Sequence, residues 1–248
     1  MKKILLFALP LMAMCFASCE KENGNDGPSG QKLVKEITWI EDDYLMARTY
    51  EYDSQYRIIK MIEALNGVGV YETTVEYNGN TIVESFRERN NDGWSNSQHY
   101  AKHYLDNDGY VVKSESISIS DGRVVSSTTY EYENGYLKTV KESNSDFNTE
   151  TEYEWLNGDI VREDSGEYQY LDNEDKTNID FLNTSVSISY AGIRFKGTCS
   201  RHLMSRYSID SQGTEWINTT YEFDADGYPI IRRDISEAYT MEVNITYY

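Results

Sequence analysis

"TYEYENGYLK", residues 129–138, decides the fold, because close variants of it return along the chain. The variants are TYEYDSQYRI from Thr49, TVEYNGNTIV from Thr74, TEYEWLNGDIV from Thr151 and TYEFDADGYPI from Thr220. Each variant reads as a strand that ends in an aromatic residue, then a tight turn, then a return strand. Asn134–Gly135 is a strong hairpin signal, since a type I′ turn needs a positive φ at both central residues. The repeated unit is therefore predicted to be a β-hairpin.

The residues between the turns alternate between apolar and polar types. In EAYTMEVNITYY, at the end of the chain, Met241, Val243 and Ile245 fall on one face, while Glu242 and Asn244 fall on the other. A period of two is typical of a strand with one buried face. The buried face is rich in aromatic and β-branched residues, which fit a pleated surface.

The spacing of the repeats predicts the size of the sheet. The strand-end positions are Tyr52, Tyr77, Leu105, Tyr132, Trp155 and Phe223, and the first four steps are 25, 28, 27 and 23 residues. Such a period holds one hairpin. The pattern frays between residues 165 and 215, where a short helix over 178–186 is a hypothesis. We predict an all-β, antiparallel meander of about 14–17 strands that curls into a barrel-like or strongly bent sheet.

Turn chemistry also explains two calcium-like stretches. DNDG at 106–109 and DADG at 224–227 are each followed by an apolar strand rather than by the remaining ligands of a calcium loop. Both are interpreted as turns, because Asp and Asn favour turn entry and Gly supplies the left-handed residue. In ISISDGRVVS, a two-residue turn at Asp121–Gly122 would set Ile119 opposite Val124.

The first residues have the features of a secretory signal. Lys2 and Lys3 precede an apolar run of 13 residues, which is too short to span a bilayer but normal for a signal peptide. The run ends in FASC, which resembles the lipobox of bacterial lipoproteins, in which the cysteine is lipidated. We expect a lipoprotein signal peptide over 1–18 and lipidation at Cys19. An ordinary signal peptide, which would leave Cys19 as a thiol, is the alternative.

We expect residues 19–31 to form the lipidated cysteine and an acidic, flexible tether, and residues 32–248 to form a single antiparallel β domain. The tether sequence EKENGNDGPSGQ cannot bury apolar surface. Its twelve residues have a reach of roughly 20 Å. The start CEKEN resembles the signal that exports some lipoproteins to the outer face. We therefore expect an outer-membrane lipoprotein of the cell envelope, exposed on the surface, with a periplasmic position as the alternative.

Charge and cysteine content restrict the partners. Without Lys2 and Lys3 the chain carries 21 basic and 42 acidic residues, a formal charge of −21. Such a surface repels phosphate, so no nucleic acid is expected, and the membrane is expected as a partner only through the N-terminal lipid. Cys199 is the one cysteine within residues 32–248, so no intramolecular disulfide is expected.

The repeats also carry a family resemblance. FDADGYPI and YDSQYRII resemble the core of YD repeats, although the second has Tyr56 where glycine is expected. Together with the lipobox, the acidic tether and the stretch GTCSRHLMSRY, they are similar to an uncharacterised lipoprotein family of gut Gram-negative anaerobes. The resemblance implies a porin-like antiparallel β fold and an envelope location. It implies no catalytic residue, because that family has no assigned function.

No motif predicts chemistry. His99 and His103 lie on one face of a strand, as a metal pair does, but no third ligand is evident and His202 stands alone. We therefore expect no enzyme, no catalytic residue, no metal and no cofactor. A membrane-embedded barrel is a rival, yet both faces of RIIKMIEA and VESFRERN carry charges, which a lipid-facing strand disfavours.

The aromatic content suggests a binding function. The chain has 22 Tyr and four Trp against seven Phe, so most rings carry a polar group. Such rings are enriched at interfaces. They also suit half-exposed turn flanks, as Tyr110, Tyr136 and Tyr228 would be. We predict a non-enzymatic binding module for a glycan or a protein, with unknown ligand-binding residues. The alternatives are a scaffold of an envelope complex and a hydrolase.

Overall fold

The structure is a computed structural model that describes residues 32–41, 44–90, 92–164, 166–180, 188–208, 215–237 and 240–248. Its regular elements are sixteen strands: β1 (Val34–Glu41), β2 (Tyr44–Tyr52), β3 (Ile58–Leu65), β4 (Val68–Asn78), β5 (Thr81–Asn90), β6 (Gly93–Leu105), β7 (Val111–Ser118), β8 (Val124–Glu133), β9 (Tyr136–Asn144), β10 (Asn148–Leu156), β11 (Asp159–Glu163), β12 (Gly166–Glu174), β13 (His202–Ser208), β14 (Trp216–Phe223), β15 (Pro229–Ile235) and β16 (Thr240–Tyr247). Among the described residues, no helix is long and apolar enough to cross a membrane.

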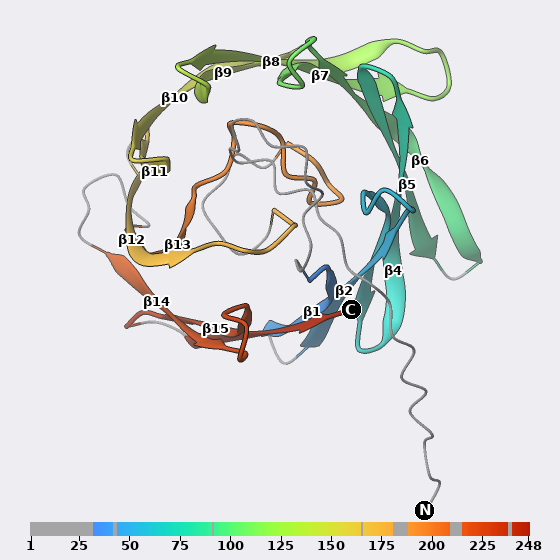
Figure 1. Cartoon of the computed structure of the whole chain (residues 1–248). Helices are drawn as coiled ribbons and strands as arrows, with labels where there is room; N and C mark the ends of the chain where they lie inside the picture. The colour runs from blue at the N-terminus through green and yellow to red at the C-terminus, as the bar shows by residue number, and fades with distance from the viewer. Residues whose placement is uncertain are drawn as a thin grey trace, which may run out of the picture.

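The strands form one closed barrel. Each strand pairs antiparallel with the next one along the chain, and β16 pairs with β1 to complete the ring seen in Figure 1. The predicted all-β antiparallel meander and its strand number are therefore confirmed, and of the two predicted shapes, a barrel-like or a strongly bent sheet, the structure has the barrel. The helix suggested over 178–186 falls mainly on residues 181–187, which lie outside the described residues.

The repeated motif places its aromatic rings inside the barrel and its acidic residues outside. In TYEYE, Tyr130 belongs to the buried core and Tyr132 packs against that core, while Glu131 between them is exposed. TEYEW behaves in the same way, with Tyr153 and Trp155 inside. Alternation along a strand therefore explains why the motif keeps an acid between two rings.

The strand-end aromatic of the motif ties neighbouring strands together. The hydroxyl of Tyr52 donates to the Val34 carbonyl oxygen at 2.7 Å, and the indole of Trp155 donates to the Leu137 carbonyl oxygen at 2.6 Å. The hydroxyls of Tyr77 and Tyr247 donate in the same way to the carbonyl oxygens of Ile58 and Pro229. Tyr170 and Tyr221, which lie further inside their strands, donate to those of Ile160 and Met204. Tyr132 is an exception, because its buried hydroxyl has no partner within the described residues.

A β-bulge recurs beside these bonds. The register shifts by one residue where the strand-end ring meets the start of the next strand, as between Glu131 and Tyr132 opposite Leu137. The same shift occurs at Tyr52, Leu105, Trp155 and Phe223. A bulge disrupts the ladder locally. The bulge thus lets the carbonyl oxygen of the residue at the start of the return strand, such as Leu137, accept a hydrogen bond from a side chain of the following strand.

The outer wall carries ladders of alternating charge. Arg233 on β15 binds Glu222 on β14 at 2.6 Å and Glu242 on β16 at 2.7 Å. The same acid–base–acid order joins Glu131, Lys141 and Glu150, joins Glu154, Arg162 and Glu167, and joins Glu51, Lys60 and Glu72. Arg87 extends the last ladder and holds the pKa of the Glu72 carboxyl below its usual value. The net negative charge of the chain is thus partly balanced at the outer wall.

The repeated turns all lie at one end of the barrel, here called the motif end. Three of them share one design, in which an aspartate accepts two backbone N–H groups. The carboxylate of Asp53 binds the amides of Gln55 and Arg57, and Asp106 and Asp224 repeat the arrangement. The turn interpretation of DNDG and DADG is confirmed. The opposite end, where hairpins turn at residues 66–67, 119–123 and 145–147, is called the cavity end.

The glycine positions of these turns have the predicted backbone. Asn134 and Gly135 both have positive φ, at 54° and 85°, as a type I′ turn requires. Gly109 and Gly227 have φ of 87° and 78°. Tyr56, which replaces glycine in the first copy, also has a positive φ of 62°. That conformation is unfavourable for a bulky L-residue.

Replacing Tyr56 with glycine is therefore expected to maintain or raise stability, by up to about 1 kcal/mol, because the left-handed strain is relieved. The reverse change at the equivalent position, Gly109→Tyr, is expected to lower stability by about 1–2 kcal/mol. Urea unfolding monitored by circular dichroism measures both. If Tyr56→Gly lowered stability as much as Gly109→Tyr does, the left-handed backbone at this position would not determine the stability of the turn.

The hairpin at Asp121–Gly122 differs from the prediction. Ile117, not Ile119, lies opposite Val124, and the Ser118 amide donates to the Arg123 carbonyl oxygen. The loop therefore contains residues 119–122 rather than two residues. Gly122 has a φ of 69°, and its amide closes a wider turn back to Ser118. The expected register was wrong by two residues, which leaves Ile119 exposed at the tip.

Candidate functional site

The lumen of the barrel is occupied by the chain between β12 and β13. Residues 175–180 and 188–201, here called the plug, lie within the ring of strands in Figure 1. The plug residues Ile179, Ala191 and Phe195 are buried in the same core as the lumenal faces of the strands. The neck of the plug is closed by the Asp175 amide, which donates to the Arg201 carbonyl oxygen at 2.9 Å. The region where the repeat pattern breaks down thus contains an insertion, the plug, that lies inside the barrel (Figure 1).

The plug is fastened to the residues that begin the return strands. The amide of Val34 donates to Asn178 Oδ1 at 2.9 Å, and the amide of Leu137 donates to the Gly197 carbonyl oxygen at 2.8 Å. The amide of Ile160 donates to Ser200 Oγ at 3.0 Å. The carbonyl oxygens of these three fully buried residues accept hydrogen bonds from aromatic side chains of a neighbouring strand. Their amides donate hydrogen bonds to the plug. Buried backbone groups must be paired, so barrel and plug complete each other.

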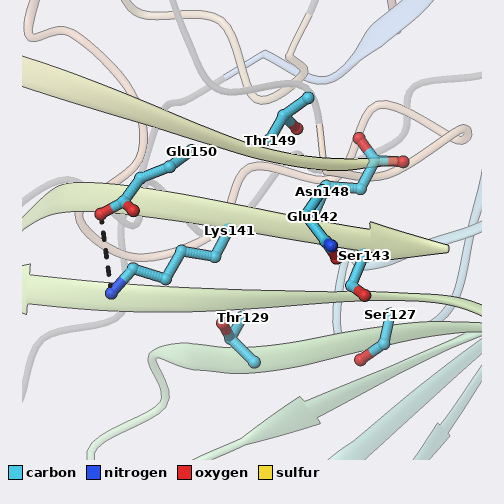
Figure 2. A pocket seen from close by; sticks show the side chains of 8 residues that line it. All are labelled: Ser127, Thr129, Lys141, Glu142, Ser143, Asn148, Thr149 and Glu150. Atoms are coloured by element: carbon cyan, nitrogen blue, oxygen red, sulfur yellow. Dashed lines mark ion pairs between the residues drawn. The ribbon is translucent and has the colours of Figure 1, made fainter. Parts of the chain in front are cut away.

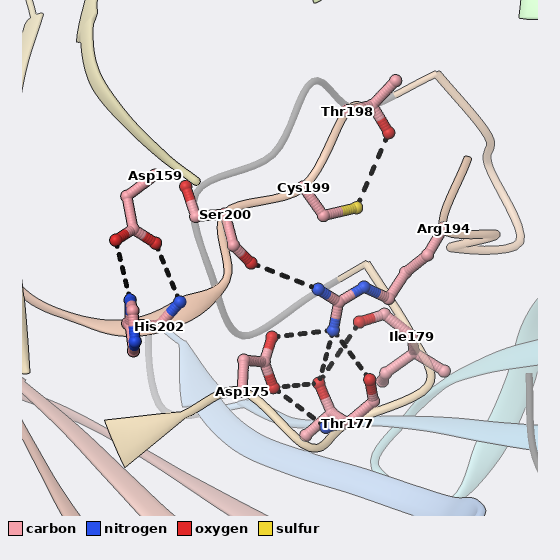
Figure 3. Close-up of polar contacts among 9 residues, drawn as sticks. All are labelled: Asp159, Asp175, Thr177, Ile179, Arg194, Thr198, Cys199, Ser200 and His202. Atoms are coloured by element: carbon pink, nitrogen blue, oxygen red, sulfur yellow. Dashed lines mark hydrogen bonds and ion pairs between the residues drawn. The ribbon is translucent and has the colours of Figure 1, made fainter. Parts of the chain in front are cut away.

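A buried ion pair holds the plug in shape (Figure 3). Arg194 Nη1 donates to Asp175 Oδ2 at 2.8 Å and to the Thr177 carbonyl oxygen at 2.7 Å. The other oxygen of Asp175 accepts the amide and the hydroxyl of Thr177. The two charged side chains are only 7 % and 1 % exposed. A pair this deeply buried is sensitive to the loss of either partner.

A second carboxylate, that of Glu84, binds the plug at residues 189–191. Glu84 on β5 is fully buried and accepts hydrogen bonds from the amides of Tyr190 and Ala191, at 3.0 and 3.2 Å, and from the Ser189 hydroxyl. His103 Nε2 lies 3.4 Å from the same carboxylate. These bonds fix the backbone of residues 189–191. Tyr190 itself remains 67 % exposed.

A cavity of about 790 Å³ lies where Tyr190 faces the strands. Its lining comes from β2 to β7 and from the plug. The residues are Arg48, Met61, Glu63, Tyr71, Glu72, Thr73, Phe86, Arg87, Glu88, Ser95, Asn96, Ser97, Gln98, His99, Ala101, Ser116 and Tyr190. The volume falls in the range of small-molecule sites.

The register of the sheet explains why these residues meet. Glu63 lies opposite Arg48 on one side and Tyr71 on the other, and Tyr71 lies opposite Glu88, which pairs with Ser95. Five successive strands thus contribute one row towards the cavity end. The next row, nearer the middle of the barrel, contains Met61, Thr73 and Phe86. The ring of Phe86 contacts that of Tyr190 edge-on, with centroids 4.6 Å apart.

A second hollow, of about 330 Å³, lies over β8, β9 and β10 (Figure 2). It is lined by Ser127, Thr129, Lys141, Glu142, Ser143, Asn148, Thr149 and Glu150. Lys141 and Glu150 form its one ion pair, at 3.6 Å, among the residues drawn. The lining has no aromatic ring, so the cavity beside Tyr190 is the better candidate for a ligand.

The histidines singled out in the sequence have separate surroundings. His103 Nδ1 lies 2.7 Å from Ser114 Oγ, whereas His99 lines the cavity. His202 Nδ1 contacts Asp159 at 2.8 Å, at the motif end (Figure 3). No cluster of three potential metal ligands occurs within the described residues. Cys199 is buried beside Thr198 Oγ1 at 3.6 Å, and Cys19 lies outside the described residues.

The tyrosines at the turn flanks are packing residues. Tyr110 packs on Tyr132 and Tyr136 on Trp155, each with centroids 4.8 Å apart. Tyr228 contacts Lys32 through its hydroxyl and is only 5 % exposed, so the expectation that it would be half-exposed is wrong. Most of the aromatic excess therefore belongs to a belt at the motif end. Among the described residues, Tyr71 and Tyr190 are the exposed tyrosines that line the cavity.

Fold and site together define a closed sixteen-stranded barrel with an internal plug and a cavity at one mouth. No family model and no curated protein matches the chain. Among solved structures, it is similar to a porin-like protein from Bacteroides uniformis, with a TM-score of 0.61 and 19 % identity, over 88 % of this chain and 98 % of that one. It is also similar to a porin-like protein from Bacteroides vulgatus, with a TM-score of 0.56 and 12 % identity, over 88 % and 99 %. The porin-like fold expected from the family resemblance is confirmed.

Proposed function

We propose that the protein is a non-enzymatic binding module of the cell envelope, which holds a glycan or protein ligand in the cavity beside Tyr190. The observation that carries this proposal is the cavity itself, with exposed rings of Tyr71 and Tyr190 among hydroxyl and amide groups. Conduction is disfavoured because the plug residues Ile179, Ala191 and Phe195 pack into the core inside the barrel. A passive scaffold needs no such cavity. A carboxylate-based hydrolase is disfavoured because Glu63 is committed to Arg48 at 2.7 Å.

We further propose attachment to the outer membrane through a lipid on Cys19. The first described residue, Lys32, pairs with Asp226 at the motif end, at 2.7 Å. A tether of residues 20–31 would therefore leave from that end, and the cavity end would point away from the membrane. The charged outer wall favours a barrel that stands in water, since a charged side chain facing lipid costs up to about 2–4 kcal/mol.

Changing Cys19 to alanine is expected to abolish lipidation and release the protein from the membrane fraction. Stable attachment needs more than one acyl chain, so the native N-terminus should carry several. Intact-mass measurement of the mature protein tests this directly. An unmodified cysteine in the native protein would overturn the anchor, without affecting the binding proposal.

Binding is tested by capture from intact cells and from glycan mixtures. The bait is residues 32–248, which contain all sixteen strands and the plug. The matched variants are Tyr190→Ala, in the cavity, and Tyr44→Ala, which is 51 % exposed outside it. We expect Tyr190→Ala alone to lose the ligand. Trp94, whose ring lies 5.1 Å from the guanidinium of Arg87, should report binding by fluorescence. No ligand in any mixture would favour the scaffold.

A further inference from the structure

The two basic residues of the cavity are already neutralised. Arg48 Nε lies 2.7 Å from Glu63, and its guanidinium lies 5.5 Å from the Trp39 ring. Arg87 Nε lies 2.5 Å from Glu72 in the same way. A paired guanidinium has little attraction left for an anionic ligand. Arg87 also ends the charge ladder of Glu51, Lys60 and Glu72 described above, so the two arginines hold neighbouring strands together.

One acidic residue of the lining has no such partner. Glu88 is exposed, and its carboxylate forms no ion pair within the described residues. With two basic and three acidic residues, the lining has a formal charge of −1. The whole chain carries −19. An anionic ligand would meet repulsion from both sources.

The uncharged part of the lining suits a ligand with both apolar faces and hydroxyl groups. Tyr71 and Tyr190 are 48 % and 67 % exposed, so each offers a ring face. The β5–β6 hairpin adds a run of short polar side chains, Ser95, Asn96, Ser97 and Gln98. Rings supply apolar contact area, while amides and hydroxyls donate and accept hydrogen bonds. Sugar rings present this combination, with C–H groups on their faces and hydroxyls around the edge.

We infer that the cavity binds a neutral saccharide, with Tyr190 as the ring on which a sugar stacks. This inference rests on the proposed binding function and adds the chemical class of the ligand. Tyr190 suits the role because Glu84 fixes its backbone from below. Its ring also leans on Phe86, which limits its movement. Glu88 acts as the element that rejects acidic sugars.

Calorimetric titration of the whole chain, in a detergent without a sugar head group, tests the ligand class. The probes are linear oligomers of glucose, mannose and galactose, with oligogalacturonate as the acidic arm and glucosamine oligomers as the cationic arm. We expect a neutral oligomer to bind and the acidic arm to fail. Tyr190→Ala should weaken binding at least tenfold and more than Tyr190→Phe, which keeps the ring, whereas Tyr44→Ala should stay within about threefold of the native protein. Glu88→Gln should reduce the difference in affinity between the neutral oligomer and oligogalacturonate.

The outcomes separate the inference from the proposed function. Preference for the acidic or the cationic arm would overturn the neutral-sugar class and leave the binding function standing. Neutral sugar that binds native protein and Tyr190→Ala equally would overturn the site. If capture yields a protein partner that depends on Tyr190 while every saccharide fails, the inference is wrong and the binding function holds. Failure of both experiments would reject both.

Discussion

Gly197→Ala is expected to lower the free energy of unfolding by about 2–5 kcal/mol. Gly197 has a φ of 72°, which costs an L-residue about 1–2 kcal/mol. A Cβ atom there would also overlap the Gly135 carbonyl oxygen and lie 3.1 Å from the ring of Tyr110. Neither neighbour can easily move, because Gly135 is in a tight turn and Tyr110 is packed on Tyr132. Overpacking adds about 1–3 kcal/mol.

Gly79→Ala is the matched control for Gly197→Ala. Gly79 has a similar φ of 62°, but a Cβ atom there meets nothing within 4 Å. It should cost only the conformational part, about 1–2 kcal/mol. Urea unfolding of both variants gives the difference. Equal midpoints would mean that the plug does not press against the β8–β9 turn.

Arg194→Met is expected to cost about 3–5 kcal/mol, because it leaves the Asp175 carboxylate buried without its cation. The change also removes the donor to the Thr177 carbonyl oxygen. The double variant Asp175→Asn with Arg194→Met should recover part of the loss, since no uncompensated charge remains.

Arg162→Met supplies the control for Arg194→Met on the outer wall. Arg162 also contacts carboxylates, but it is 47 % exposed and its partners are similarly exposed. Exposed pairs contribute about 0–1 kcal/mol, so this variant should unfold almost as the native protein does. A loss at Arg162 as large as that at Arg194 would contradict the burial argument.

Local patterns predicted the barrel because each hairpin repeats the same local chemistry. Alternation placed Tyr130 inside and Glu131 outside, and Asn134–Gly135 gave the turn without any knowledge of the rest of the chain. The loop at Asp121–Gly122 was mispredicted because a four-residue loop and a two-residue loop can both use an Asp-Gly pair. Only the pairing of the flanking strands distinguishes them.

The cavity could not be predicted in the same way. Arg48, Tyr71 and Ser95 are far apart in sequence and meet only through the register of five strands. Tyr190 lies in the insertion, where the repeat gives no information about position. The frayed repeat between residues 165 and 215 was nevertheless a usable signal. An interruption in a regular array marks the segment that does something other than build the wall.

Closure of the ring by β1 and β16 has a consequence for how the molecule reaches its native state. Every other strand pairs with a neighbour in the sequence, but this seam joins residues about 210 positions apart. The sheet can zip progressively from hairpin to hairpin, yet it keeps two unpaired edges until Thr240–Tyr247 has been synthesised. Open edges recruit other chains. A nascent or truncated copy lacking β16 should therefore aggregate, because both edges of its sheet stay open.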